Sequence, residues 1–288
     1  MKALAISGGS TKIAFLAGAA VELHKNNDYK ILTGISAGSI ICLLLAINEL
    51  EILKDAIFST NSEDFFRFVP VTDNDKVKIR SVIRVLMGKE SLAEYRLKDL
   101  LKDYYKPEHH EKMQNCGKIV KIGATNLNLK QIEYCDITKV DYETALDWVV
   151  ASSSIPLTTQ LVKIGQYYYT DGGVKEHVGG IEALNSGATE LDVLFSRSEI
   201  NELTEDDIAW KPKNIVDVLF RVLNTMSRDI SDEDEKVIYK ECRITSTPLR
   251  MWFAPFTLTR SLYKMDPDLS KSWFSLGSDT IEENPEGN

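Results

Sequence analysis

The sequence predicts an α/β fold, in which a mostly parallel sheet carries helices on both faces. Apolar runs at residues 2–7 and 29–33 have the length of buried strands. Each run is followed by a stretch with helical periodicity, at 13–25 and 39–59. Strands that alternate with helices pair in parallel, because each helix carries the chain back across the sheet.

Residues 61–107 interrupt this alternation with a polar stretch of helical character. The segment at 95–101 places its leucines at helical spacing, and no strand pattern is evident in this part of the chain. We therefore expect an insertion over about residues 61–110 that forms a helical lid over the site.

The sheet resumes with two hairpin patterns. Residues 118–125 and 131–135 form the first pair of expected strands, and residues 161–164 and 167–170 form the second. Between the two pairs, Asp141 precedes an apolar helical stripe and has a side chain that is preferred at a helix N-cap.

The last third of the chain begins with a helix at 180–185 and a strand at 190–196. A long amphipathic helix follows, because apolar residues recur at helical spacing. Its apolar face carries Ile215, Val218, Leu219, Val222, Leu223 and Met226. We interpret the acidic run at 230–236 as a solvated face or loop, and residues 282–288 as a frayed end.

Length and composition favour a single domain over residues 1–288. A chain of 288 residues that is 43% hydrophobic can bury one large core, with residues 213–288 as a C-terminal helical extension. The net charge of -9 argues against nucleic acid as a partner, because phosphate binding depends on clustered lysine and arginine. The sequence does not indicate an oligomeric state.

The cysteines indicate a reducing compartment. Cys42, Cys116, Cys135 and Cys242 are scattered without a Cys-x-x-Cys pair, so neither a zinc site nor a disulfide framework is predicted. We expect a cytoplasmic location.

No window approaches the roughly 18 apolar residues of a transmembrane helix, so any membrane contact is expected to be peripheral. Two aromatic stretches, at 64–71 and 249–258, are candidates for such contact. The second has Arg250, Arg260 and Lys264 around it. The alternative is that these aromatic residues belong to the core.

A Gly-x-Ser-x-Gly pattern stands between the second expected strand and its helix, as Gly34-Ile35-Ser36-Ala37-Gly38. A serine on such a turn needs small neighbours, because only then does the backbone reverse without burying the hydroxyl. The helix that follows directs its N-terminus at any oxyanion formed beside the serine. The pattern thus predicts a nucleophile elbow.

A serine nucleophile needs a base that takes its proton, and the histidines fit this role poorly. His24 lies in a helix with a surface face, and His109 and His110 lie in a polar loop. Asp171 is the better candidate, because it closes a strand and is followed by Gly172 and Gly173, which allow close approach. Burial beside an acyl pocket would raise the pKa of this carboxyl into a useful range.

The loop after the first strand is the candidate oxyanion hole. Gly8, Gly9 and Ser10 offer consecutive backbone N–H groups, and Lys12 adds positive charge nearby. The alternative is a phosphate loop, but neither Gly-x-Gly-x-x-Gly nor the P-loop pattern is present.

Four motifs in this order resemble the patatin-like phospholipase family. They are the glycine-rich loop, the elbow, Ala-Ser-Ser-Ser-Ile-Pro at 151–156, and Asp-Gly-Gly at 171–173. The resemblance covers residues 1–196. It implies a three-layer α/β/α sandwich with a Ser-Asp dyad and without a catalytic histidine, metal or cofactor.

Residue by residue, the resemblance implies that Ser36 is the nucleophile and Asp171 the base. Gly8, Gly9 and Ser10 would form the oxyanion loop with Lys12 behind them, and Gly34, Gly38, Gly172 and Gly173 would support the elbow and the dyad. The chain departs from the family pattern at Ser10 and Ile13, where glycines are usual, and Ser10 carries an expected cost of about 1 kcal/mol. His177 and Gly179 replace the usual Asn and Pro, so His177 is expected near the dyad as a pocket wall or a hydrogen-bond partner.

The implied activity is hydrolysis of acyl esters in phospholipids or neutral lipids through an acyl-serine. The expected partner is thus a lipid acyl ester. Two alternatives stay open: an acyltransferase that uses the same acyl-serine, and a catalytically weak member that binds lipid or a protein. Retention of both Ser36 and Asp171 argues against the second alternative.

Overall fold

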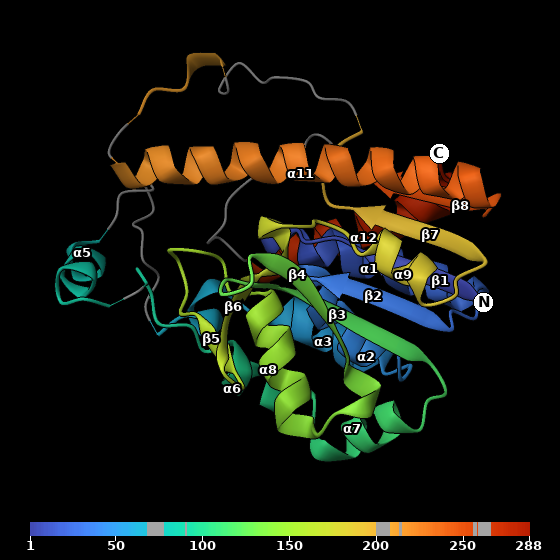
Figure 1. Cartoon of the computed structure of the whole chain (residues 1–288), viewed down its shortest axis with the longest axis horizontal. Helices are drawn as coiled ribbons and strands as arrows, with labels where there is room; N and C mark the ends of the chain where they lie inside the picture. The colour runs from blue at the N-terminus through green and yellow to red at the C-terminus, as the bar shows by residue number, and fades with distance from the viewer. Residues whose placement is uncertain (68–77, 90, 200–207, 213–214, 256–257, 259–265) are drawn as a thin grey trace.

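The protein is described by a computed structural model, whose described residues are 1–67, 78–89, 91–199, 208–212, 215–255, 258 and 266–288. Its centre is an eight-stranded sheet in the order β5-β6-β3-β2-β1-β7-β8, with β4 paired to β3 (Figure 1). The strands are β1 (Lys2–Ile6), β2 (Ile31–Ile35), β3 (Ile119–Asn126), β4 (Gln131–Asp136), β5 (Val162–Ile164), β6 (Tyr167–Asp171), β7 (Glu190–Phe195) and β8 (Leu249–Phe253). Five neighbouring strands, β3, β2, β1, β7 and β8, are parallel. The predicted hairpins β3-β4 and β5-β6 are antiparallel.

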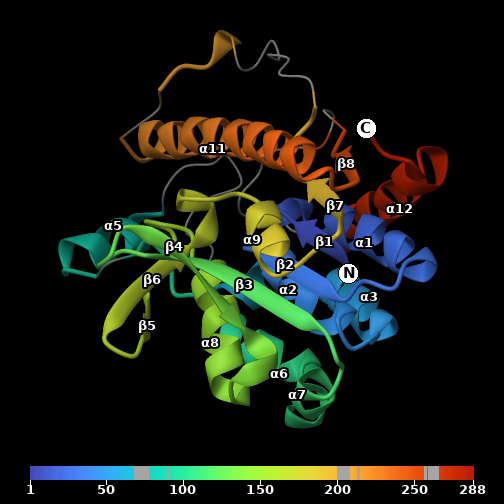
Figure 2. The ribbon, with the colours of Figure 1, turned by 45° about the vertical axis from the view of Figure 1, so that its right-hand side comes forward.

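Helices cover both faces of this sheet, which confirms the predicted three-layer α/β/α fold. They are α1 (Ile13–Asn26), α2 (Ala37–Leu45), α3 (Leu50–Ser59), α4 (Ser62–Phe65), α5 (Ile79–Leu86), α6 (Leu97–Tyr104), α7 (Pro107–Gln114), α8 (Tyr142–Ser152), α9 (Gly180–Asn185), α11 (Ile215–Thr245) and α12 (Pro267–Glu283). In two views, α11 lies on the side of the sheet opposite to α2 and α8 (Figures 1 and 2).

The alternation of side chains along β1 shows why two layers of helices form. Leu4 and Ile6 pack into a core with α1, α2, α3, α8 and α12, whereas Ala3 and Ala5 pack with α9 and α11. Successive residues of a strand point to opposite faces, so an all-apolar strand needs a helix layer on each side.

The C-terminal part differs from the sequence-based expectation. Residues 249–253 form the parallel edge strand β8 rather than helix, so the extension from 213 onward is not purely helical. The last residue, predicted to be frayed, exchanges two backbone hydrogen bonds with Met251, at 2.9 and 3.3 Å. Helix α12 packs closely along α1, because a Cβ on Gly277 would lie 2.1 Å from the Phe15 carbonyl oxygen.

Two further expectations need correction. The expected helix over 39–59 is two helices, α2 and α3, with a turn at Asn48 in which φ is 60°. The acidic run at 230–236 is part of α11, and Asp234 points inward, where it accepts the backbone N–H groups of His177 and Val178 at 2.6 and 3.2 Å. Among the described residues, no helix is long and apolar enough to cross a membrane.

Candidate active site

Strand β3 brings Ser36 and Asp171 together from distant parts of the sequence. Strand β2 ends opposite Gly123 of β3, and β6 ends with Asp171 opposite Ala124, the next residue along β3. Both strands lie on the edge of β3 that β4 does not occupy, because β4 pairs with β3 over residues 121–126. The residue after β2, Ser36, therefore meets the last residue of β6.

The turn at Ser36 has a strained backbone. Its φ of 51° and ψ of -118° lie in a region that L-residues rarely adopt, and the strain is typical of residues whose position a functional site requires. The glycines on either side have no room for a side chain: a Cβ on Gly38 would lie 2.2 Å from the Ile6 carbonyl oxygen, and one on Gly34 would lie 2.6 Å from the Gly38 carbonyl oxygen. Helix α2 begins at Ala37, so its positive N-terminus adjoins the serine.

Asp171 is buried beside this serine, with 7% of its surface exposed. Burial raises the pKa of its carboxyl to about 6, although hydrogen bonds from the Ser36 hydroxyl and the Gly173 N–H lower it. The Gly173 N–H lies 2.8 Å from Oδ1, and Gly172 and Gly173 start the short 3₁₀ turn η3 (Gly172–Val174). At neutral pH the carboxylate is therefore ionised and more basic than an exposed one.

Three consecutive serines at the end of α8 fix the backbone of both residues. The Ser152 Oγ accepts the Ser36 N–H at 2.8 Å and donates to the Gly123 carbonyl at 2.6 Å. The Ser153 Oγ donates to the Ser36 carbonyl at 3.2 Å. The Ser154 carbonyl accepts the Asp171 N–H at 2.9 Å. The Ser-Ser-Ser triplet was part of the sequence resemblance, but its role as a clamp required the structure.

The glycine-rich loop after β1 lies close to Ser36 at Gly8. A Cβ on Gly8 would lie 3.3 Å from the Cβ of Ser36. The Gly8 N–H already has a partner in this arrangement, because it donates to the His177 carbonyl at 3.0 Å. Gly9 and Ser10 follow Gly8 in the same loop, and Ser10 also lines the pocket described below.

The departures from the family pattern in this loop have different consequences. Ser10 has a φ of 47°, so a side chain stands where glycine is favoured, as expected. Ile13, in contrast, is the first residue of α1 with φ of -51°, so a side chain there is unstrained. The Lys12 Nζ donates to the Ser196 carbonyl at 2.8 Å, which ties the loop to the end of β7.

His177 lies behind the glycine-rich loop. Its ring is close to Gly8 and Gly173, and burial together with the charges of Arg197, Lys12 and Arg228 lowers its pKa to about 4. It is therefore neutral at physiological pH. It is not among the residues that line the pocket described below.

The other histidines lie in α1 and α7, outside the pair formed by Ser36 and Asp171. His110 was expected in a polar loop but is buried in α7, where it bonds the Tyr105 hydroxyl at 3.0 Å and the Val140 carbonyl at 2.8 Å. His24 is partly buried at the end of α1. Among the described residues, no group of three or more His, Cys, Asp or Glu side chains is arranged to hold a metal ion.

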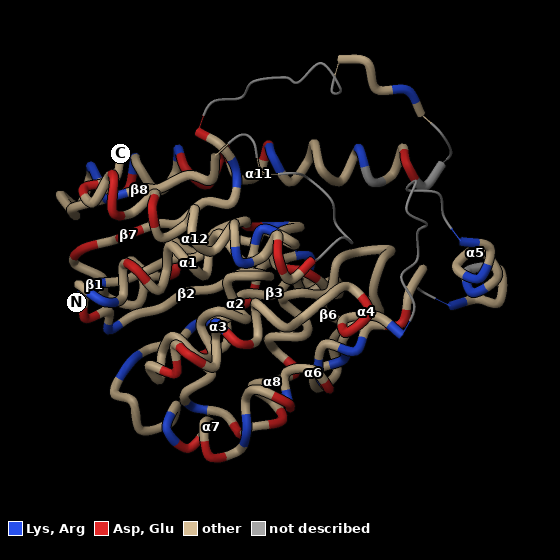
Figure 3. Tube along the Cα trace, turned by 180° about the vertical axis from the view of Figure 1, so that it is seen from behind, with Lys and Arg blue, Asp and Glu red and all other residues tan. Residues whose placement is uncertain are grey.

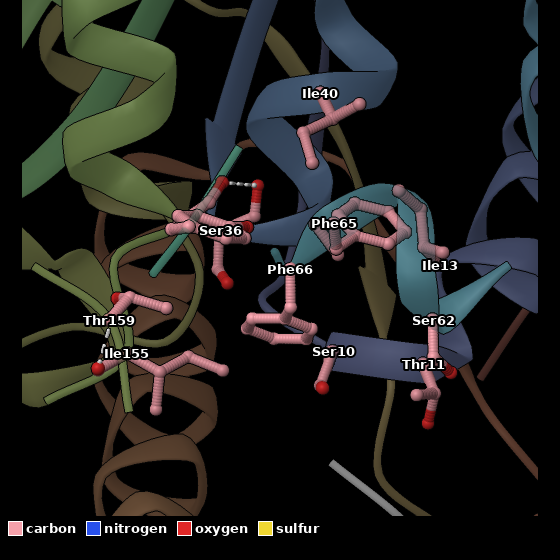
Figure 4. A pocket seen from close by; sticks show the side chains of 13 residues that line it. Ser10, Thr11, Ile13, Ser36, Ile40, Ser62, Phe65, Phe66, Ile155 and Thr159 are labelled. Atoms are coloured by element: carbon pink, nitrogen blue, oxygen red, sulfur yellow. Dashed lines mark hydrogen bonds between the residues drawn. The ribbon is translucent and has the colours of Figure 1, made fainter. Parts of the chain in front are cut away.

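A pocket opens beside Ser36 and is mostly apolar. Its space, including the open mouth, is about 550 Å³. The lining residues surround Ser36 in Figure 4: Ser10, Thr11, Ile13, Ser36, Ala37, Ile40, Ser62, Phe65, Phe66, Tyr95, Ser153, Ile155 and Thr159. The rings come from the insertion, where Phe66 forms an isolated β-bridge with Tyr95. The insertion was expected to cover the site, but these rings were not predicted to form a wall of the pocket.

The two aromatic stretches proposed for membrane contact lie elsewhere than expected. Phe65 and Phe66 of the first face the pocket, and 68–71 lie outside the described residues. In the second, Trp252 is 2% exposed and Arg250 binds Asp192 at 2.6 Å, so the alternative of a core role is correct for β8. Arg260 and Lys264 lie outside the described residues.

Fold and site together define an α/β protein with a strained serine beside a buried carboxylate. The sequence profile of the patatin-like phospholipases matches residues 4–179, and the chain belongs to this family. It is 29% identical over 186 residues to "Probable lipid hydrolase 463L" of Invertebrate iridescent virus 6, a match that covers 60% of each chain.

A solved structure, VipD from Legionella pneumophila, aligns with a TM-score of 0.43 and 12% identity over 98% of this chain and 66% of that one. Both matches thus cover less than two thirds of the relative's length.

Proposed function

We propose that this protein is a serine lipid acyl hydrolase that cleaves carboxylic esters of phospholipids or other acyl lipids. The observation that carries the proposal is the Ser36 hydroxyl, which stands on a strained turn, is hydrogen bonded to the buried Asp171, and opens into an apolar pocket. An apolar pocket beside a nucleophile suits an acyl chain, because binding the chain places the ester carbonyl at the serine. Family membership and the viral relative's name agree with this chemistry.

In the proposed mechanism the Asp171 carboxylate takes the proton of the Ser36 hydroxyl as Oγ attacks the ester carbonyl. The proton then passes to the oxygen of the leaving alcohol. The alcohol departs, and the acyl group stays on Ser36 as an acyl-serine. Water attacks this ester with Asp171 again as base, and the fatty acid is released. The N–H groups of Gly9 and Ser10 and the N-terminus of α2 stabilise the oxyanion in both steps.

Burial gives Asp171 its role without a histidine. A carboxylate with an ordinary pKa is a weak base at neutral pH. With a pKa of about 6, the Asp171 carboxylate is a stronger base and is still ionised at neutral pH. The proposed steps therefore use neither a metal nor a histidine.

Release of fatty acid from phosphatidylcholine vesicles and from a soluble p-nitrophenyl ester tests the proposal. Ser36→Ala and Asp171→Asn should each lower kcat/KM by about 10³-fold or more, because nucleophile and base act as a unit. Ser278→Ala is the matched control, since this serine lies on α12 and bonds Glu22 at 2.9 Å. Full activity of Ser36→Ala would overturn the proposal, and transfer of the acyl group to added alcohols in place of water would indicate an acyltransferase.

A further inference from the structure

Helix α5 (Ile79–Leu86) presents its apolar side to solvent and its polar side to the protein. Five large apolar side chains are exposed: Ile79 by 74%, Val82 by 39%, Ile83 by 47%, Leu86 by 80% and the following Met87 by 74%. Their spacing of three or four residues places them on one face of the helix.

The opposite side of α5 faces residues 91–94 of the same insertion. Ser81 is fully buried, and the Arg84 guanidinium lies 3.5 Å from the Ser91 carbonyl and 3.8 Å from Glu94. A helix at a water-exposed surface normally buries its apolar face, so this orientation is stable only where the outward side meets an apolar medium.

The charged residues of this segment itself are all positive. Residues 78–89 contain Lys78, Arg80, Arg84 and Lys89 and no acidic residue, in a chain whose net charge is -9. In Figure 3, α5 has blue segments and no red ones, and it lies at the edge of the molecule. An apolar face flanked by lysine and arginine suits a lipid surface with anionic headgroups, because the chains accept the apolar residues and the phosphates attract the cations.

The insertion connects α5 directly to the pocket. Phe66 and Tyr95 flank this part of the insertion in the sequence, and both rings line the pocket. The two ends are joined by the bond from the Arg67 N–H to the Glu94 carbonyl at 3.0 Å, and by that from the Arg96 N–H to the Phe65 carbonyl at 2.8 Å. Helix α5 lies beyond the end of the sheet at which β1 and β2 terminate, the end that carries Ser36 (Figure 1).

We infer that α5 is an interfacial anchor that inserts Ile79, Val82, Ile83, Leu86 and Met87 into an anionic lipid surface. The inference rests on the proposed function in one respect, namely that the docked surface supplies the substrate of the adjoining pocket. Docking through α5 brings the pocket mouth to the lipid and lets an acyl chain move from the surface to Ser36.

The test measures binding of the full chain to sedimenting vesicles of phosphatidylcholine, with and without about 30% phosphatidylserine. Ile83→Glu/Leu86→Glu should weaken binding at least tenfold, because two charges replace two inserted side chains. The matched control is Val237→Glu/Ile244→Glu, which changes two residues of α11 that are 41% and 66% exposed and should leave binding unchanged. Lys78→Glu/Lys89→Glu should weaken binding only to the anionic vesicles and abolish its salt dependence.

Hydrolysis of a soluble ester separates this inference from the proposed function. The α5 variants should cleave the soluble ester like the wild type and lose vesicle hydrolysis in proportion to binding. Vesicle binding that depends on α5 in a protein without esterase activity would contradict the proposed function but support the anchor. The anchor is overturned if the wild type ignores anionic vesicles, if the glutamate variant binds them equally, or if that variant instead dissociates a dimer seen by light scattering.

Discussion

The two walls of the pocket are held in place by different interactions. The wall that carries Ser36 lies at the end of the sheet, where the hydroxyls of Ser152 and Ser153 bond the peptide groups on both sides of this serine. In the wall from the insertion, ring packing adds to the backbone bonds between residues 65–67 and 94–96: Phe66 lies 5.6 Å from Tyr95 between centroids, and Phe65 lies 6.5 Å from it.

This difference matches the work that each wall is proposed to do. Attack on a carbonyl tolerates little displacement, so the nucleophile needs directional hydrogen bonds in a buried setting. Binding an acyl chain needs only volume and apolar surface, which ring packing supplies and small shifts preserve. We therefore expect substitutions in the first wall to change kcat, and substitutions in the second to change which substrate is preferred.

Among substitutions of residues that support the two walls, Ser152→Ala should have the largest effect, because it removes the hydroxyl that bonds both the Ser36 N–H and the Gly123 carbonyl. Two buried backbone groups then lose a partner, which should cost about 1–3 kcal/mol of unfolding free energy. Displacement of the elbow should lower kcat about 100-fold with little change in KM. Steady-state kinetics and urea unfolding measure the two effects.

The control for Ser152→Ala is Ser270→Ala on α12, which removes another buried serine hydroxyl from a residue that does not line the pocket. It should leave kcat unchanged. If Ser152→Ala lost stability but kept its kcat, the clamp would be structural only, and the contrast between the two walls would disappear.

Phe66→Leu should alter selectivity while keeping the chemistry. Phe66 is 7% exposed and lines the pocket, so a smaller side chain widens the space for an acyl chain. The ratio of kcat/KM for long and short acyl esters should change by about tenfold, with kcat on the preferred ester retained. Phe58→Leu is the control, because Phe58 packs on Phe274 at 5.2 Å, away from the pocket. An equal change in that variant would argue against Phe66 as a selective wall.

Ser10→Gly should have the smallest effect and should be favourable. Glycine adopts the φ of 47° at this position without steric cost, so the free energy of unfolding should rise by about 0.5–1 kcal/mol. Activity should stay within about threefold of the wild type, because the backbone N–H is kept. Ser10→Ala keeps the Cβ and should show no gain, and a gain of equal size there would contradict the role of backbone strain.

Local patterns predicted the part of the fold that surrounds the site. The run from β1 to α2 and both hairpins are encoded in neighbouring residues, and the capping of α8 by Asp141 follows from its side chain. The pairing of Ser36 with Asp171 was also reached from the sequence, because a serine elbow needs a base and only one candidate closed a strand.

Contacts between distant segments were not predictable in the same way. The packing of α12 on α1 depends on Gly277 meeting Phe15, and the burial of β8 depends on the free edge of β7. Asp234 was interpreted as solvated because its neighbours are acidic, yet it accepts two backbone N–H groups. The engagement of the Gly8 N–H by His177 likewise depends on a loop far along the chain.

The most direct test of the central claim is the pH dependence of covalent labelling of Ser36 by a fluorophosphonate, followed by peptide mass spectrometry. Asp171 activates the serine only when it is ionised, and burial raises its pKa to about 6. The labelling rate should therefore fall about tenfold per pH unit below pH 6 and level off above it, and Asp171→Asn should abolish this dependence together with most of the rate. Labelling of another residue, or an unchanged pH profile in Asp171→Asn, would contradict the account.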